Sequence, residues 1–229
     1  MNKDYAFQWS EGIGETFTLL VPNLYGGGGA VNVGTGSKTY EALTGLGVAE
    51  QNAEAYSQNV STYWGDQPFL AGPVYFGALV IFFFVLSFFV VQNRLKWFIL
   101  GIAILGFMMA WGRHFPALNY FMFDHLPFYN NFRTPSMSMV IPGFMFTLLA
   151  FWGLHEFFTK PLDSEQQVAI LKKSFLITGG LCLILTFGSK MLLDFKGPND
   201  DRVKERLSQQ FGDNKQAVTQ MYDALVSDR

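Results

Sequence analysis

Residue types that build soluble catalytic and metal centres are scarce in this sequence. Of its 229 residues, one is cysteine and three are histidine. A single cysteine excludes an intramolecular disulfide, and because Cys182 lies in an apolar run we interpret it as a small packing residue. The histidines, His114, His125 and His155, are too scattered to predict a metal site. We therefore expect neither a disulfide framework nor a bound metal.

Clusters of basic residues are missing as well. The chain has 16 Lys and Arg against 18 Asp and Glu, a formal net charge of −2 and a pI near 5.9. Binding to the phosphates of a nucleic acid needs clustered Lys and Arg side chains. We expect no nucleic-acid partner.

Long apolar runs, in contrast, are abundant. Residues 69–91 are 23 residues without a charge, and about 20 residues are enough to cross a hydrocarbon core of about 30 Å. Residues 95–112, 137–154 and 174–193 form three more runs, and Pro142 followed by glycine predicts a kink in the third. The sequence predicts an all-α, polytopic integral membrane protein with about four transmembrane helices.

The alternative is that these runs are buried core helices of a soluble protein. Four such runs within the 125 residues from 69 to 193 leave too little polar surface for that. We therefore favour the membrane interpretation.

Basic residues in short turns predict the orientation, because Lys and Arg resist translocation. Arg94 and Lys96 follow the first run, and Lys160, Lys172 and Lys173 separate the third from the fourth. We expect both turns to face the cytoplasm. The segments expected outside are a polar loop (residues 1–68), an amphipathic loop (113–136) and a tail (194–229).

Both ends of the sequence look like cuts in a larger protein. The first residues lack the basic and apolar regions of a signal peptide, although the predicted topology requires their export. In the tail, apolar residues recur at three- and four-residue spacing, with a break at Gly212 and Asp213. The tail is therefore expected to be helical. Its apolar positions are Val203, Leu207, Phe211, Val218, Met221, Tyr222 and Leu225.

Four blocks of residues resemble, in order, the YfhO-like family of bacterial membrane proteins. They are Gln8-Trp9-Ser10-Glu11-Gly12-Ile13-Gly14-Glu15-Thr16 running on to Gly26-Gly27; Tyr63-Trp64-Gly65-Asp66-Gln67-Pro68-Phe69 with Gly72-Pro73-Val74-Tyr75; Ala110-Trp111-Gly112-Arg113; and Pro127-Phe128-Tyr129-Asn130-Asn131-Phe132-Arg133 with Ser136-Met137. The resemblance covers nearly the whole chain. It is closest to long members from Bacteroidetes-type bacteria, of which this chain would be an internal fragment.

The resemblance implies a GT-C glycosyltransferase architecture in the bacterial inner (cytoplasmic) membrane. Such proteins take a sugar from a polyprenyl-phosphate carrier, and some modify cell-envelope polymers, which makes membrane lipids, a lipid-linked sugar and a polymer acceptor the expected partners. A carboxylate assists the acceptor hydroxyl while cations hold the departing lipid phosphate. The family's usual acidic residue lies in a first outer loop that this chain does not contain. The catalytic residue is therefore unknown, and no cofactor is predicted besides the donor lipid.

The loop 113–136 mixes cations with aromatic residues, which is the combination that a lipid-linked phosphate requires. Arg113, His114, His125 and Arg133 are the candidate phosphate-binding residues, because a guanidinium can offer two parallel donors to phosphate oxygens. The alternative is an ordinary interfacial aromatic belt whose arginines contact lipid headgroups or backbone carbonyls.

Two carboxylates in the outer regions are candidates for the acceptor side, namely Glu15 and Asp66. The alternative for each is a carboxylate that caps a turn or a helix. The stretch from Gly34 to Thr39 superficially resembles a phosphate-binding loop, but Ser37 and Asn32 occupy the two positions at which that motif has glycine. We interpret it as a flexible glycine-rich loop.

Two other functional classes stay open at the level of sequence. A transporter or flippase segment would carry ionisable residues deep in the membrane, whereas Lys96 and Lys190 lie near the ends of their runs. A non-catalytic scaffold of envelope assembly would lack the missing catalytic carboxylate altogether.

Overall fold

The computed structural model describes residues 2–68, 70, 72, 74–212 and 214–229. Within these residues the regular secondary structure is helical, with two isolated β-bridges, so the predicted all-α fold is confirmed at this level. The chain divides into two compact units. Unit 1 is Met1–Val21 with Val74–Met191, and unit 2 is Pro22–Pro73 with Leu192–Arg229. The first 21 residues thus belong with the apolar helices rather than with the remainder of the polar loop.

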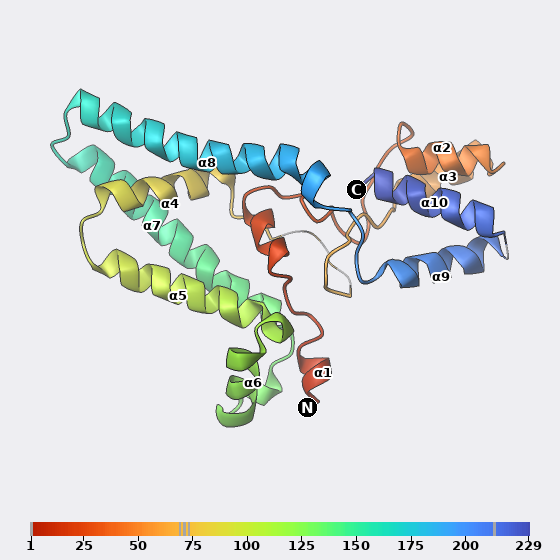
Figure 1. The fold of residues 1–229 in the computed structure, drawn as a ribbon, viewed down its shortest axis with the longest axis horizontal. Coiled ribbons are helices and arrows are strands. Elements are labelled where there is room, and N and C mark those ends of the chain that lie inside the picture. The colour runs from red at the N-terminus through yellow and green to blue at the C-terminus, as the bar shows by residue number, and fades with distance from the viewer. Residues whose placement is uncertain (1, 69, 71, 73, 213) are drawn as a thin grey trace. The chain divides into compact units, whose positions relative to one another are not determined.

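Unit 1 contains the apolar helices and several short helices, most of them in or next to the loop 113–136 (Figure 1). The long elements are α4 (Ala78–Val90), α5 (Leu95–Ala110), α7 (Val140–Thr159) and α8 (Ser164–Leu192). The shorter ones are α1 (Lys3–Ala6), η1 (Gly14–Leu19), η2 (Gly112–His114), α6 (Pro116–His125), η3 (Tyr129–Asn131) and η4 (Pro135–Met139).

Two segments of unit 1 are long and apolar enough to cross a membrane, Pro135–Thr159 and Ser164–Ser189. They include the third and fourth predicted runs. Helices α4 and α5 are shorter, with 13 and 16 residues, or about 20 and 24 Å at 1.5 Å per residue. The run predicted from residue 69 becomes helical only at Ala78, after Gly77 with φ +99°, and Phe69 itself lies outside the described residues.

Pro142, at which a kink was predicted, lies close to the junction of η4 with α7. Helix α7 begins at Val140, so Pro142 lies in its first turn, where a missing N–H group breaks no intrahelical hydrogen bond. Pro142 is buried. A Cβ added to Gly106 of α5 would lie 2.6 Å from Pro142 Cδ, so the proline serves as a packing surface between α5 and α7.

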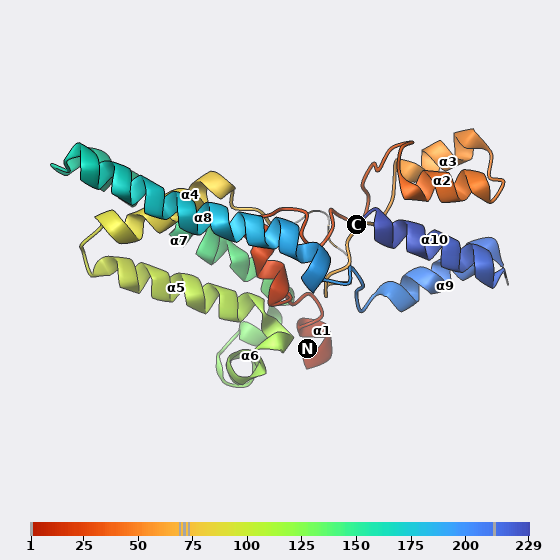
Figure 2. The ribbon, with the colours of Figure 1, turned by 45° about the horizontal axis from the view of Figure 1, so that its top comes forward.

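A second close crossing joins α4 to α7. A Cβ added to Gly153 would lie 2.6 Å from the Cα atom of Ser87, which means that the two backbones touch at this point. Small residues allow two apolar helices to approach this closely. Helices α4, α5 and α7 lie side by side in both views (Figures 1 and 2), and α8 has most of its apolar residues exposed.

The two basic turns lie at one end of unit 1 (Figure 1). Lys96 Nζ donates hydrogen bonds to the carbonyl oxygens of Phe88 and Val91, at 3.0 and 2.6 Å. Lys160 Nζ, from the other turn, donates to the carbonyl oxygen of Val90 at 2.6 Å. Lysines from both turns therefore bind the carbonyl groups that the end of α4 leaves without an intrahelical donor.

Among its described residues, unit 2 contains four helices, and the predicted helical tail supplies two of them. Helices α9 (Asp200–Phe211) and α10 (Lys215–Ser227) are separated by Gly212, with φ +63°, as the pattern predicted; Asp213 lies outside the described residues. Helix α10 packs against α9 and against α2 (Lys38–Gly45), which contacts α3 (Glu50–Ser57). The shared core includes Leu43, Ala53, Val60, Leu207, Met221 and Leu225.

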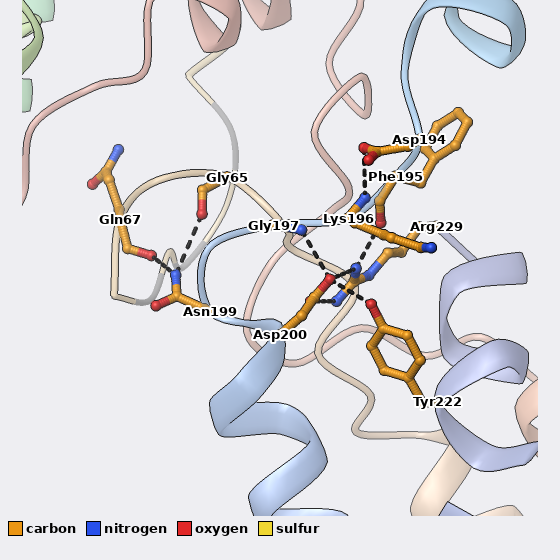
Figure 3. Close-up of polar contacts among 10 residues, drawn as sticks. All are labelled: Gly65, Gln67, Asp194, Phe195, Lys196, Gly197, Asn199, Asp200, Tyr222 and Arg229. Atoms are coloured by element: carbon orange, nitrogen blue, oxygen red, sulfur yellow. Dashed lines mark hydrogen bonds and ion pairs between the residues drawn. The ribbon is translucent and has the colours of Figure 1, made fainter. Parts of the chain in front are cut away.

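A buried ion pair connects α9 with the end of α10 (Figure 3). Arg229 Nη2 lies 2.6 Å from Asp200 Oδ1, and Arg229 Nη1 donates to Asp200 Oδ2 at 3.1 Å. The Tyr222 hydroxyl and the Gly197 N–H group also donate to Oδ2, at 2.7 and 2.9 Å. The Arg229 side chain is 1% exposed, so the carboxylate and the guanidinium compensate each other inside unit 2.

Candidate functional site

The first residues of the chain pack against the loop 113–136 of unit 1. The N–H groups of Thr134 and Ser136 donate to the carbonyl oxygens of Ala6 and Trp9, at 3.3 and 3.2 Å. The Phe7 ring lies 5.2 Å from the ring of Tyr120. Lys3 forms a 2.6 Å ion pair with Asp124, and its Nζ also lies 5.4 Å from the Tyr120 ring. The N-terminal segment and the loop therefore form one structure.

A cavity of about 280 Å³ lies where these segments meet. Its lining is mostly apolar. Arg133 is the charged side chain among the lining residues that the structure describes. The lining residues are Ala6, Phe7, Met109, Tyr129, Phe132, Arg133, Thr134, Pro135, Met137 and Ser138.

Tyr5 holds the Arg133 side chain in place. Arg133 Nη1 donates to the Tyr5 hydroxyl oxygen at 2.7 Å, and the guanidinium carbon lies 5.9 Å from the centre of the Tyr5 ring. Arg133 is exposed, and within the described part of the chain it forms no ion pair. A guanidinium has five N–H donors, so Arg133 keeps donors for an anionic ligand.

The loop around Arg133 has an unusual backbone. Phe128 and Thr134 have φ values of +67° and +92°, in a backbone region that residues other than glycine rarely adopt. Each such residue costs about 1–3 kcal/mol, and strain of this kind gathers at ligand-binding sites. Phe128, Phe132 and Met137 are 73–75% exposed, so the loop carries a solvent-facing apolar rim.

The other predicted phosphate-binding residues do not line the cavity. The N–H group of Arg113 donates to Ser10 Oγ at 2.9 Å, and its Nε lies 3.4 Å from His114 Nε2. His125 stacks on Phe121 at 4.6 Å, and its Nδ1 lies 3.0 Å from the carbonyl oxygen of that residue. Of the four predicted residues, the structure thus brings Arg133 alone to the cavity.

The two predicted carboxylates belong to different units. Glu15 lies in η1 of unit 1 and is 1% exposed, and its carbonyl oxygen accepts a 2.7 Å hydrogen bond from Thr18 Oγ1. Asp66 lies in unit 2 and is half-buried. Neither residue lines the cavity beside Arg133.

Tyr5, Phe7 and Met137 were not predicted as site residues. Tyr5 is 128 positions away from Arg133 in sequence, and no local pattern relates the two. The sequence signal that could have pointed to this site was the set of apolar residues close to Arg133 in the loop.

A scan against family models and searches of curated proteins and of solved structures returned no match to this chain. What the cavity can bind therefore follows from its own residues. Its apolar lining, exposed aromatic rim and tyrosine-held guanidinium suit a ligand with an apolar tail and a phosphate-like head.

Proposed function

We propose that this chain is a membrane-embedded section of a YfhO-like, GT-C-type glycosyltransferase that binds a polyprenyl-phosphate-linked sugar in the cavity beside Arg133. The observation that supports this most directly is the exposed guanidinium at an apolar cavity, held by the Tyr5 hydroxyl at 2.7 Å. In this proposal the guanidinium binds the lipid phosphate, while Phe132 and Met137 contact the first isoprene units.

The chemistry assigned to these residues is binding and charge stabilisation. A phosphate that leaves from a sugar gains negative charge, and a cation held in a fixed position stabilises that charge without reorganising. The Tyr5 hydroxyl restricts the guanidinium, which reduces the ordering that ligand binding would require. No residue of this chain is assigned the role of base.

The proposed topology has four spans, α4, α5, α7 and α8, with both basic turns in the cytoplasm. The common position of these turns at one end of unit 1 supports it. It places the Arg133 cavity, which lies beyond the opposite ends of α5 and α7, on the outer side of the inner membrane.

Binding of a polyprenyl phosphate to the purified protein in detergent tests the proposal. Arg133→Ala should weaken binding at least tenfold, and Arg133→Lys should weaken it less, since lysine keeps the charge but loses the paired donors. Arg94→Ala is the matched control, because Arg94 is an exposed arginine in the α4–α5 turn. Unchanged binding in both Arg133 variants would rule out this site.

Cysteine labelling in intact cells tests the topology separately. In a Cys182→Ser background, Arg94→Cys should react with a membrane-impermeant maleimide only after the cells are opened, whereas Asn130→Cys should react before. Labelling at position 94 in intact cells would invert the proposed orientation.

A further inference from the structure

Unit 2 contains a cavity that the proposed function does not use. Its volume is about 340 Å³, which falls in the range of sites that hold small ligands. Its lining differs from that of the Arg133 cavity, because it consists mainly of glycine backbone and polar side chains. The lining residues are Asn23, Gly26, Gly27, Gly28, Val31, Val33, Thr62, Gly72, Asp228 and Arg229.

Backbone forms one wall of this unit 2 cavity because side chains do not fit there. Gly26 has φ +79°, and a Cβ at this position would collide with the carbonyl oxygen of Thr62. A Cβ added to Gly27 would lie 2.8 Å from Val31 Cγ2. The peptide groups of this wall are already paired: the N–H groups of Gly26 and Gly27 donate to Asn23 O and Thr62 Oγ1, and the carbonyl oxygen of Gly28 accepts from Thr62. Hydrogen bonds to a ligand therefore fall to the polar side chains of the lining.

Three polar side chains add hydrogen-bonding groups of both kinds. Thr62 is buried, and its Oγ1 accepts the N–H of Gly27 at 3.0 Å, which leaves the hydroxyl proton able to donate. Asn23 is exposed at the cavity and brings an amide with both donors and an acceptor. Arg229 Nε is buried and, among the described residues, has no acceptor.

The two charged residues of the lining are already compensated. The Asp228 carboxylate accepts the N–H groups of Lys38 and Thr39 at the start of α2, at 2.9 and 2.8 Å. The Arg229 guanidinium pairs with Asp200 at 2.6 Å. A free cation or anion therefore gains little there, while the carboxylate oxygens still have lone pairs that can accept hydroxyl protons.

Val31 and Val33 complete the lining with apolar surface. A cavity with donors, acceptors and C–H surface but no uncompensated charge matches the surface of a sugar ring, which combines hydroxyl groups with C–H faces. We propose that the unit 2 cavity binds a neutral monosaccharide unit. This inference is independent of the lipid-phosphate site, because all the residues that carry it belong to unit 2.

Glycine substitutions in unit 2 provide a matched test. A Cβ added to Gly72, which lines the cavity, or to Gly36, which does not, meets nothing within 4 Å, and neither residue has a positive φ. Gly72→Leu should therefore occupy the cavity without disturbing the fold, and Gly36→Leu is the control. Asn23→Leu removes the amide from the rim but keeps a side chain branched at Cγ, and gives a second, independent variant.

Saturation-transfer NMR with free glucose, galactose and N-acetylglucosamine measures binding to the full chain, in a detergent without a sugar headgroup. At least one sugar should receive saturation from the wild type and from Gly36→Leu, and its affinity should fall at least tenfold in Gly72→Leu and clearly in Asn23→Leu. Absence of transfer to all three sugars, equal affinity in Gly72→Leu, or displacement of the sugar by inorganic phosphate would each overturn the proposal. Since no polyprenyl phosphate is present, failure here leaves the lipid-site experiment unaffected.

Discussion

Lys160 at the end of α7 donates a 2.6 Å hydrogen bond to the carbonyl oxygen of Val90 in the last turn of α4. The same ammonium lies 3.0 Å from the Glu156 carboxylate one turn earlier in its own helix. One side chain thus satisfies a buried carbonyl group and fixes the end of α4 against α7. At the same end, the carbonyl oxygens of Phe88 and Val91 accept hydrogen bonds from Lys96.

Lys160→Met should lower the free energy of unfolding by about 1–2 kcal/mol, because the charged donor of a buried carbonyl group is lost while the aliphatic stem remains. Denaturant unfolding in a fixed detergent measures the change. Lys172→Met, an exposed lysine on α8, should change stability by less than about 0.5 kcal/mol. Equal effects of both substitutions would contradict the capping role.

Gly153→Ala should destabilise unit 1 by about 1–3 kcal/mol, because the added methyl group has to separate the backbones of α4 and α7. Gly101→Ala in α5 is the control, since a Cβ there meets nothing within 4 Å and alanine favours helix more than glycine does. Thermal unfolding of the two variants should therefore shift in opposite directions. An unchanged unfolding temperature in Gly153→Ala would show that the backbones of α4 and α7 do not touch at this crossing.

Acid should destabilise unit 2 through Asp200. Burial raises the pKa of Asp200, but the hydrogen bonds from Arg229, the Gly197 N–H group and Tyr222 together hold it below its ordinary value of 3.8. The stabilisation from this carboxylate is therefore present above about pH 4 and is lost as the pH falls through the lowered pKa. Hydrogen exchange of α9 and α10, corrected for intrinsic rates, should report this loss.

Asp200→Asn is the matched variant for the acid experiment. It leaves the guanidinium of Arg229 buried without its counter-charge, which should cost about 3–5 kcal/mol at neutral pH. The acid-dependent loss should disappear from this variant. If protection of α9 and α10 fell with acid in the variant as it does in the wild type, another carboxylate would be responsible.

Alkali should act on unit 2 through Tyr222. Burial and the hydrogen bond to Asp200 raise the pKa of Tyr222 to about 12, from about 10 for an ordinary tyrosine. Its stabilising contribution is complete below about pH 10 and is lost as the pH rises through 12. The absorbance difference between the wild type and Tyr222→Phe should titrate near 12, and a midpoint near 10 would exclude the buried hydrogen bond.

Thr134→Gly should stabilise the loop of the Arg133 cavity by about 1 kcal/mol. The φ of Thr134 is +92°, which glycine adopts without strain, and its N–H group can still bind the carbonyl oxygen of Ala6. Thr147→Gly inside α7 should instead lose about 0.3 kcal/mol of helix propensity, and also the hydrogen bond from Thr147 Oγ1 to the carbonyl oxygen of Gly143. Thermal unfolding distinguishes the two, and a loss of stability at position 134 would show that the threonine side chain outweighs the backbone strain.

Apolar runs and helical spacing were enough to predict the helical class and the helices of the tail. They worked because each of these signals is local. Residues 140–154 of α7 and 174–189 of α8 are long uncharged stretches, and Leu207, Met221 and Leu225 recur at helical intervals. The start of α4 was placed too early, because residues 74–77 carry no charge, like the helix that follows, but are not helical.

Which segments of the chain make up each of the two units could not be predicted. It depends on contacts such as the one between the Lys38 N–H group and Asp228, which are 190 positions apart, and no periodicity reports a pairing at that distance. The candidate site was predicted in part for the same reason. Arg133 was selected by its residue type and neighbours, whereas Tyr5 reaches it through the fold alone.

In the four-span topology proposed above, the unequal helix lengths of unit 1 have a consequence for the surrounding lipid. An apolar helix of about 20 Å, the length of α4, is shorter than a hydrocarbon core of about 30 Å, whereas the 25-residue segment Pro135–Thr159 exceeds it. Such mismatch is relieved by thinning the bilayer beside the short helix and by tilting the long one. Acyl-chain length should therefore change the conformation of unit 1. Short-chain lipids should match the length of α4 and α5, and long-chain lipids should reduce the tilt of α7.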